Sequence, residues 1–129
     1  MKIRALPKIY LLRNKIDFEN VYRQGKRVHG ENFSLILLPN NANHNRLGIS
    51  IHGQLKGAAK RNRIKRIIRE YFRLNKHFPQ EKSSKSCRLP CMDIVLTVRK
   101  GFSLDSPAAV AGAVDRLFEH HMPLWRQIP

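Results

Sequence analysis

The stretch GAAKRNRIKRIIREYFR (residues 57–73) carries the most informative pattern in this chain. Its apolar residues recur every three or four positions, which predicts an α-helix over about residues 59–74 with one face packed on a core. That apolar face consists of Ile64, Ile67, Ile68, Tyr71 and Phe72. The opposite side of the predicted helix is almost entirely basic and consists of Asn62, Lys65, Arg66, Arg69 and Arg73.

An all-basic stripe needs an explanation, because like charges three or four positions apart weaken an isolated helix by a few tenths of a kcal/mol per pair. A face that merely contacts solvent would more often mix the two signs. The stripe therefore favours a polyphosphate partner over simple solvation. At the start of the helix, backbone N–H groups near Gly57 and Ala58 lie beside Arg61 and Arg63, and both kinds of donor suit phosphate oxygens.

The charge of the whole chain supports the same interpretation. Its 129 residues include 25 Lys and Arg against 9 Asp and Glu, a formal net charge of +16. Residues 1–76 hold 18 of the basic residues and only 4 of the acidic ones. Such an excess repels itself in a compact state unless a polyanion screens it. Nucleic acid, or an anionic membrane surface, fits this charge better than a small-molecule substrate does.

Several other classes of protein are not expected. The length suits one domain, and a hydrophobic share of 42% supports a modest core. No apolar run approaches the roughly 20 residues of a membrane span, and the basic N-terminal stretch, interrupted by Pro7, does not resemble a signal peptide. Cys87 and Cys91 cannot form a disulfide framework, so a cytoplasmic, reducing setting is expected. With His77 nearby they are weak evidence for zinc.

Periodicity and turn residues predict the remaining elements. A first helix begins at Asn14 and continues to about Arg23, where Gly25 ends it. Ser106 caps a last helix that extends to about residue 120, with proline at its first position. A polar loop is expected at 77–92. Strands are expected at 26–28, 33–38, 47–51 and 94–98.

Three segments in this order resemble the protein subunit of bacterial ribonuclease P: LGISI (47–51), the basic helix, and DIVLTVRKG (93–101). NKIDFENVYRQGKRV (14–28) is similar to the first helix of that family. The resemblance covers about residues 10–120, and Arg-Asn-Arg-Ile-Lys-Arg is its most specific part. It implies one α+β domain over residues 1–129, a ribosomal-protein-like α-β-β-β-α-β-α sandwich. The family's β-α-β crossover is left-handed, against the usual rule.

The resemblance also implies a function. In the family, the protein assists a catalytic RNA that removes the 5′ leader from precursor tRNA, and Mg²⁺ held mainly by the RNA supports the hydrolysis. The expected partners are thus the catalytic RNA and precursor tRNA, with no membrane or DNA, and the protein has no catalytic residue of its own. The family's motif helix faces the catalytic RNA. The RNA-facing residues are Arg61, Asn62, Arg63, Lys65, Arg66 and Arg69, and Arg73 continues the stripe.

In the family, a cleft between the first helix and the sheet receives the single-stranded leader. Exposed aromatic side chains beside basic residues can stack on unpaired bases, although the spacing of the aromatics here also suits a plain core. His52, Gly53 and Gln54 stand where the family usually has a serine and two lysines. The positions assigned to the cleft are Phe18, Tyr22, Phe33, Lys56, Arg99 and Lys100.

Three rival functions lead to different expectations. A protein-only nuclease needs clustered carboxylates or a paired acid and base, and the acidic residues show no such cluster along the chain. A DNA-binding regulator would usually show a helix-turn-helix pair, whereas a strand and a loop precede this basic helix. A structural ribosomal protein is the strongest rival, because it would have the same basicity without a leader-binding cleft.

Overall fold

The computed structural model describes residues 8–40, 44–52, 57–75 and 91–125. Most of the predicted 77–92 loop lies outside these ranges, as do Lys56 and Cys87, but the last strand begins at Met92, where loop was expected. The elements in chain order are a 3₁₀ turn η1 (Lys8–Tyr10), α1 (Lys15–Gln24), β1 (Lys26–His29), β2 (Phe33–Pro39), β3 (Arg46–Ile51), α2 (Ala58–Leu74), β4 (Met92–Val98) and α3 (Pro107–Trp125).

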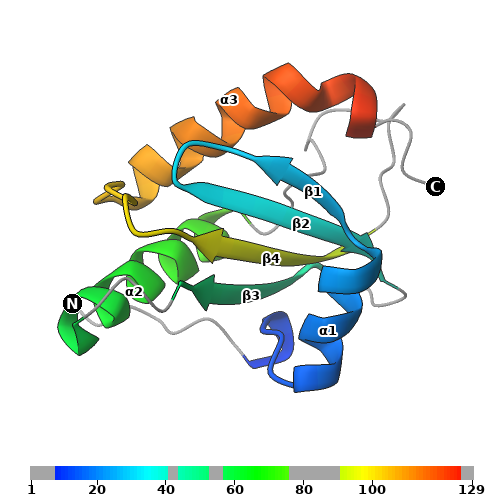
Figure 1. Ribbon diagram of the computed structural model, residues 1–129, viewed down its shortest axis with the longest axis horizontal. Coiled ribbons are helices and arrows are strands. Elements are labelled where there is room, and N and C mark those ends of the chain that lie inside the picture. Colours follow the sequence, from blue (N-terminus) through cyan, green and yellow to red (C-terminus); the bar gives the residue numbers. More distant parts are fainter. Residues whose placement is uncertain (1–7, 41–43, 53–56, 76–90, 126–129) are drawn as a thin grey trace.

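The four strands form one mixed sheet in the order β1-β2-β4-β3 (Figure 1). The central strand β4 pairs antiparallel with β2 and parallel with β3. In this register Val95 of β4 lies between Ile36 of β2 and Gly48 of β3. The two inner strands, β2 and β4, are nearly continuous in apolar residues because each is covered on both faces of the sheet.

The connection from β3 through α2 to β4 has unusual handedness. In Figure 1 both strands point left, β4 lies above β3, and α2 passes behind the sheet. This path is a left-handed crossover, whereas almost all parallel connections are right-handed. The expected α-β-β-β-α-β-α order and crossover are thus confirmed, including the short strand β1.

The two faces of the sheet carry different helices. The face behind the sheet in Figure 1 packs against α2 and α3 and forms the larger core. Of the predicted apolar face of α2, Ile67 is half-buried and the other members are buried. The opposite face packs against α1 through a small cluster of Leu12, Val21, Ile36 and Val95.

The predicted helix ends lie within about five residues of the observed ones. Of the two predicted N-caps, one forms its side-chain hydrogen bond and the other does not. The Ser106 hydroxyl accepts a hydrogen bond from the Ala109 N–H at 3.1 Å, as its sequence position predicts. Asn14 stands at the N-cap of α1 without a capping hydrogen bond from its side chain. α3 continues to Trp125, beyond the expected end near residue 120.

Gly48 of β3 lies under the Phe18 ring of α1. A Cβ at this position would lie 2.7 Å from two ring carbons of Phe18, so only glycine leaves room for the ring. We expect Gly48→Ala to displace Phe18 and lower the free energy of unfolding by about 1–3 kcal/mol, measured by urea denaturation. Gly112→Ala is the control, because its Cβ meets nothing nearer than Arg116 at 3.8 Å and alanine favours the helix. An undiminished stability of Gly48→Ala would show that the ring is not held there.

Candidate nucleic-acid interface

The solvent-facing side of α2 is basic because the buried residues Ile64 and Ile68 fix the rotation of the helix about its axis. The side chains of Arg63, Arg66 and Arg69 are exposed. We call this surface the basic face of α2; its members are Arg61, Asn62, Arg63, Lys65, Arg66 and Arg69.

Most of these charges are free to bind a partner. Within the described part of the chain, Arg63, Lys65, Arg66 and Arg69 form no ion pair. Arg73 differs, because its guanidinium donates to both carboxylate oxygens of Glu70, one of them at 3.0 Å. The same contact lowers the pKa of the Glu70 carboxyl. The charge of Arg73 is therefore compensated within the helix.

Arg61 ties the start of α2 to the end of β3. Its guanidinium donates to the backbone carbonyl of His52 at 3.4 Å, and its side chain is half-buried. Gly57 precedes the helix with a φ of 102°, a backbone conformation that favours glycine. These two features set the direction in which α2 leaves the sheet.

A groove of about 280 Å³ lies along the edge strand β3, where α1 and α2 approach from opposite faces of the sheet. It contains one aromatic side chain from α1 and two basic side chains from α2. Apolar residues of β3 complete it, together with the segment before α1, which adds a third basic side chain, Arg13. We call it the α1–α2 groove; its lining residues are Leu11, Leu12, Arg13, Phe18, Leu47, Ile49, Lys65 and Arg69.

Tyr22 lies one turn further along α1 and has its own cationic partner. The Arg27 guanidinium stands 5.7 Å from the centre of the Tyr22 ring and donates to the Tyr22 carbonyl at 3.1 Å. The tyrosine is half-buried and packs on the small cluster under α1. A ring beside a guanidinium is a suitable surface for stacking.

Beyond α1, the same face of the sheet carries a row of polar side chains that the sequence analysis did not single out. The paired residues His29, Ser34, Thr97 and Ser50 cross the four strands in register. Arg99 donates a hydrogen bond to the Ser34 hydroxyl oxygen, and the Nδ1 atom of His29 lies 2.9 Å from the same oxygen. The available signal was the single hydroxyl residue in each of β2, β3 and β4, because each one interrupts a run of apolar residues and strand alternation fixes the face on which it lies.

The structure corrects the placement of Phe33. Its side chain is 3% exposed and belongs to the core on the opposite face, where it meets Phe102 edge-on at 6.4 Å. Strand alternation places it with Leu35 and Leu37 rather than under α1. The assignment of Phe33 to a cleft under α1 was therefore wrong. Lys100 is exposed in the turn after β4.

The sequence and the fold of this chain match those of a known protein family. The family model described as Ribonuclease P matches residues 6–122. The chain belongs to the ribonuclease P protein family. The ribonuclease P protein component of Desulfotalea psychrophila is 49% identical over 118 residues, 91% of this chain and 90% of that protein. The component of Haemophilus influenzae is 34% identical over 110 residues, 84% of each chain.

Solved structures of family members have the same fold. The RNase P protein of Staphylococcus aureus superposes with a TM-score of 0.67 at 26% identity, covering 86% of this chain and 94% of that one. The RNase P protein of Thermotoga maritima superposes with a TM-score of 0.64 at 27% identity, covering 84% of this chain and 94% of that one. As a ribonuclease P protein, the chain is a component of a ribonucleoprotein nuclease of tRNA processing.

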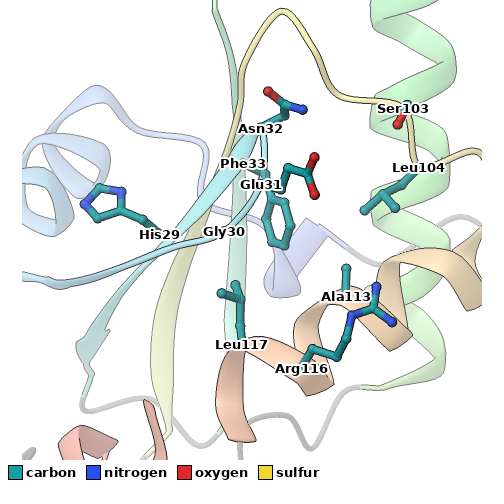
Figure 2. Close-up of a pocket in the computed structure, with 10 residues that line it drawn as sticks. All are labelled: His29, Gly30, Glu31, Asn32, Phe33, Ser103, Leu104, Ala113, Arg116 and Leu117. Atoms are coloured by element: carbon teal, nitrogen blue, oxygen red, sulfur yellow. The ribbon is translucent and has the colours of Figure 1, made fainter. Parts of the chain in front are cut away.

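A larger hollow, about 500 Å³, lies on the α3 side of this ribonuclease P protein (Figure 2). The turn between β1 and β2, the connection from β4 to α3, and α3 itself form its walls. Figure 2 shows Glu31 near the Phe33 ring and Arg116 projecting from α3. One acidic and one basic side chain balance its charge, so the hollow does not extend the basic face of α2.

The described residues offer neither a metal cage nor a membrane span. Among them, no three His, Cys, Asp or Glu side chains gather closely enough to hold a metal ion. None of the helices in those ranges is both long and apolar enough to cross a bilayer.

Proposed function

We propose that this ribonuclease P protein binds two RNAs through two surfaces that meet at Lys65 and Arg69, which belong to both. The basic face of α2 binds the catalytic RNA of the holoenzyme. The α1–α2 groove, together with the accessible members His29, Thr97 and Ser50 of the polar row, binds the single-stranded 5′ leader of precursor tRNA. By holding the leader, the protein assists Mg²⁺-dependent endonucleolytic removal of the leader by the RNA.

One observation carries this proposal: Phe18 lines the same groove as Lys65 and Arg69. A single strand offers unstacked bases and closely spaced phosphates, so it needs an aromatic platform and nearby cations. A protein that only neutralised folded RNA would need the cations without the half-buried ring. The groove therefore favours leader binding over the purely structural ribosomal role.

The proposal leaves the hydrolytic chemistry to the RNA. The described acidic residues do not fit a magnesium site, since no three of them gather with one another or with His or Cys. Magnesium held by the RNA would supply the activation of water in the holoenzyme. This chain binds the leader, orients it, and offsets the repulsion between two polyanions with its net charge of +16.

A salt titration tests the role of the basic face. Each phosphate contact contributes roughly 0.7–0.9 to the slope of log affinity against log salt concentration. We expect Arg66→Ala/Arg69→Ala to weaken binding to a bacterial ribonuclease P RNA and to reduce that slope by roughly 1.4–1.8. A filter-binding assay at several salt concentrations measures both quantities.

Arg116→Ala provides the matched control, because this exposed arginine lies on α3, away from the basic face. Its slope should stay close to that of the unmodified protein, whereas Arg66→Ala alone should lose roughly 0.7–0.9. Equal slopes for the double variant and the unmodified protein would mean that the face is only solvated.

A further inference from the structure

A buried ion pair stands beside the proposed leader groove. Asp93 of β4 is 5% exposed and accepts two hydrogen bonds from the Arg46 guanidinium, each at 2.7 Å. The Asn40 side-chain amide donates a third at 2.8 Å. Because a buried carboxylate needs such compensation, Arg46 is held firmly against the sheet at the start of β3.

The same guanidinium also reaches α1. Its Nη1 atom lies 3.8 Å from a carboxylate oxygen of Asp17, and both side chains are about one-quarter exposed. Asp17 directly precedes Phe18, and Gly48 under the Phe18 ring lies two residues after Arg46 on the same face of β3. The strand therefore contacts α1 at two adjacent points, one polar and one aromatic.

The apolar contacts of α1 hold it only weakly. Of its ten described residues, Val21 alone is fully buried. Ile16 is 69% exposed, and Phe18 and Tyr22 are half-buried. A helix with so little buried surface can tilt or roll on the sheet unless directional contacts restrain it. The Arg27–Tyr22 contact restrains the C-terminal end of α1, and the Asp17–Arg46 pair restrains the N-terminal end.

We propose that Asp17, held by Arg46, is a positioning residue for leader binding. It orients α1 so that the Phe18 ring stays over Gly48 and lines the groove with Lys65 and Arg69. This inference rests on the proposed leader-binding function, because it concerns how the groove is held in shape.

A simpler role for Asp17 must be separated from this one. An acidic residue in the first turn of a helix stabilises it through the helix dipole, wherever the helix lies. Charge alone also has an effect, since removing a carboxylate from a basic protein should strengthen RNA binding in general. A positioning role predicts a loss that is specific to the leader.

The test compares two variants of α1 that change the net charge by the same amount. Asp17→Asn and Glu19→Gln each remove one carboxylate, but in the described structure Glu19 pairs only with Lys15 of its own helix, at 3.9 Å. Each variant is assembled with a bacterial ribonuclease P RNA and Mg²⁺. The value of kcat/KM is then measured for precursor tRNA with a long leader and with a one-nucleotide leader. The ratio of the two values reports the contribution of the leader.

We expect Asp17→Asn to lower this ratio about two- to fivefold, the range that one partly exposed ion pair can supply. Glu19→Gln should leave the ratio unchanged, and Asp17→Glu, which keeps the carboxylate, should restore most of it. Circular dichroism of each variant measures helix content, which a role limited to the helix dipole would lower without a leader-specific loss.

The outcomes distinguish this inference from the function on which it rests. If Asp17→Asn matches Glu19→Gln while the unmodified protein shows a clear leader effect, Asp17 is not a positioning residue. If the unmodified protein shows no leader effect, the proposed leader binding itself is wrong. Should Asp17→Asn fold poorly, Arg46→Lys decides, because one ammonium group cannot bridge both carboxylates; a lowered ratio supports the inference and an unchanged ratio overturns it.

Discussion

Purified protein alone should leave precursor tRNA intact, and addition of a bacterial ribonuclease P RNA with Mg²⁺ should produce cleavage at the 5′ end of the mature tRNA. This result is expected because, in the proposed function, the RNA carries out the hydrolysis and the protein binds the leader. Gel electrophoresis of end-labelled precursor measures the cleavage.

The stimulation by the protein should be largest at low salt and low Mg²⁺. Under those conditions the two RNAs repel each other most, because the screening length is longest. A partner with a net charge of +16 then offsets the most repulsion. High Mg²⁺ should partly replace the protein, since divalent ions screen the same phosphates.

The control is the same protein preparation without the RNA, free of contaminating nucleases. Site-specific cleavage by the protein alone would overturn the proposed division of labour. Failure to stimulate any bacterial ribonuclease P RNA, at any salt concentration, would instead favour a purely structural role in RNA binding.

Phe18→Ala should have the largest effect of any single substitution in the groove. Loss of one stacked base costs about 1–3 kcal/mol, which corresponds to an affinity for precursor tRNA about 5- to 150-fold lower. Mature tRNA, which has no leader, should bind as before. Tyr22→Ala should act in the same direction, because Tyr22 lies one turn away on α1. Equilibrium binding of both tRNAs to the assembled holoenzyme measures the difference.

Phe18→Leu separates stacking from packing. Phe18 packs on the small cluster under α1, and leucine retains most of the apolar contact while losing the aromatic face. We expect Phe18→Leu to keep the stability of the protein and still to lose most of the leader affinity. Equal losses for precursor and mature tRNA, or loss of the folded circular dichroism spectrum, would assign Phe18 to the core instead.

The pattern of α2 could be interpreted from the sequence because helix periodicity is a local property. The recurrence of apolar residues every three or four positions predicted that Ile64 and Ile68 face inward and Arg66 faces outward, and the structure confirms all three. The helix was expected over 59–74 and is observed over 58–74. The basic charge of this face follows from the same local pattern.

The side of the sheet on which each aromatic residue lies could not be settled in the same way. The run from Phe33 to Leu38 is apolar at nearly every position, because β2 is covered on both faces. A continuous apolar strand does not indicate which residues face α1. The family resemblance placed Phe33 in the cleft, although its spacing suited the core, and the core assignment is the correct one. Ser34, the one polar residue of β2, would have been a better guide, because strand alternation places Phe33 on the face opposite to it.

Residue spacing within single segments was enough to predict the elements, the charged face of α2 and the family resemblance. The contacts between distant segments became known only from the folded chain. Folding brought Phe18 of α1 into one groove with Lys65 and Arg69 of α2, placed Gly48 under the aromatic ring, and joined Asp17 to the buried Arg46–Asp93 pair. The physical reason is that β3 is an edge strand with α1 and α2 on opposite faces. Their side chains meet around that edge, and strand order is a non-local property that no single segment encodes.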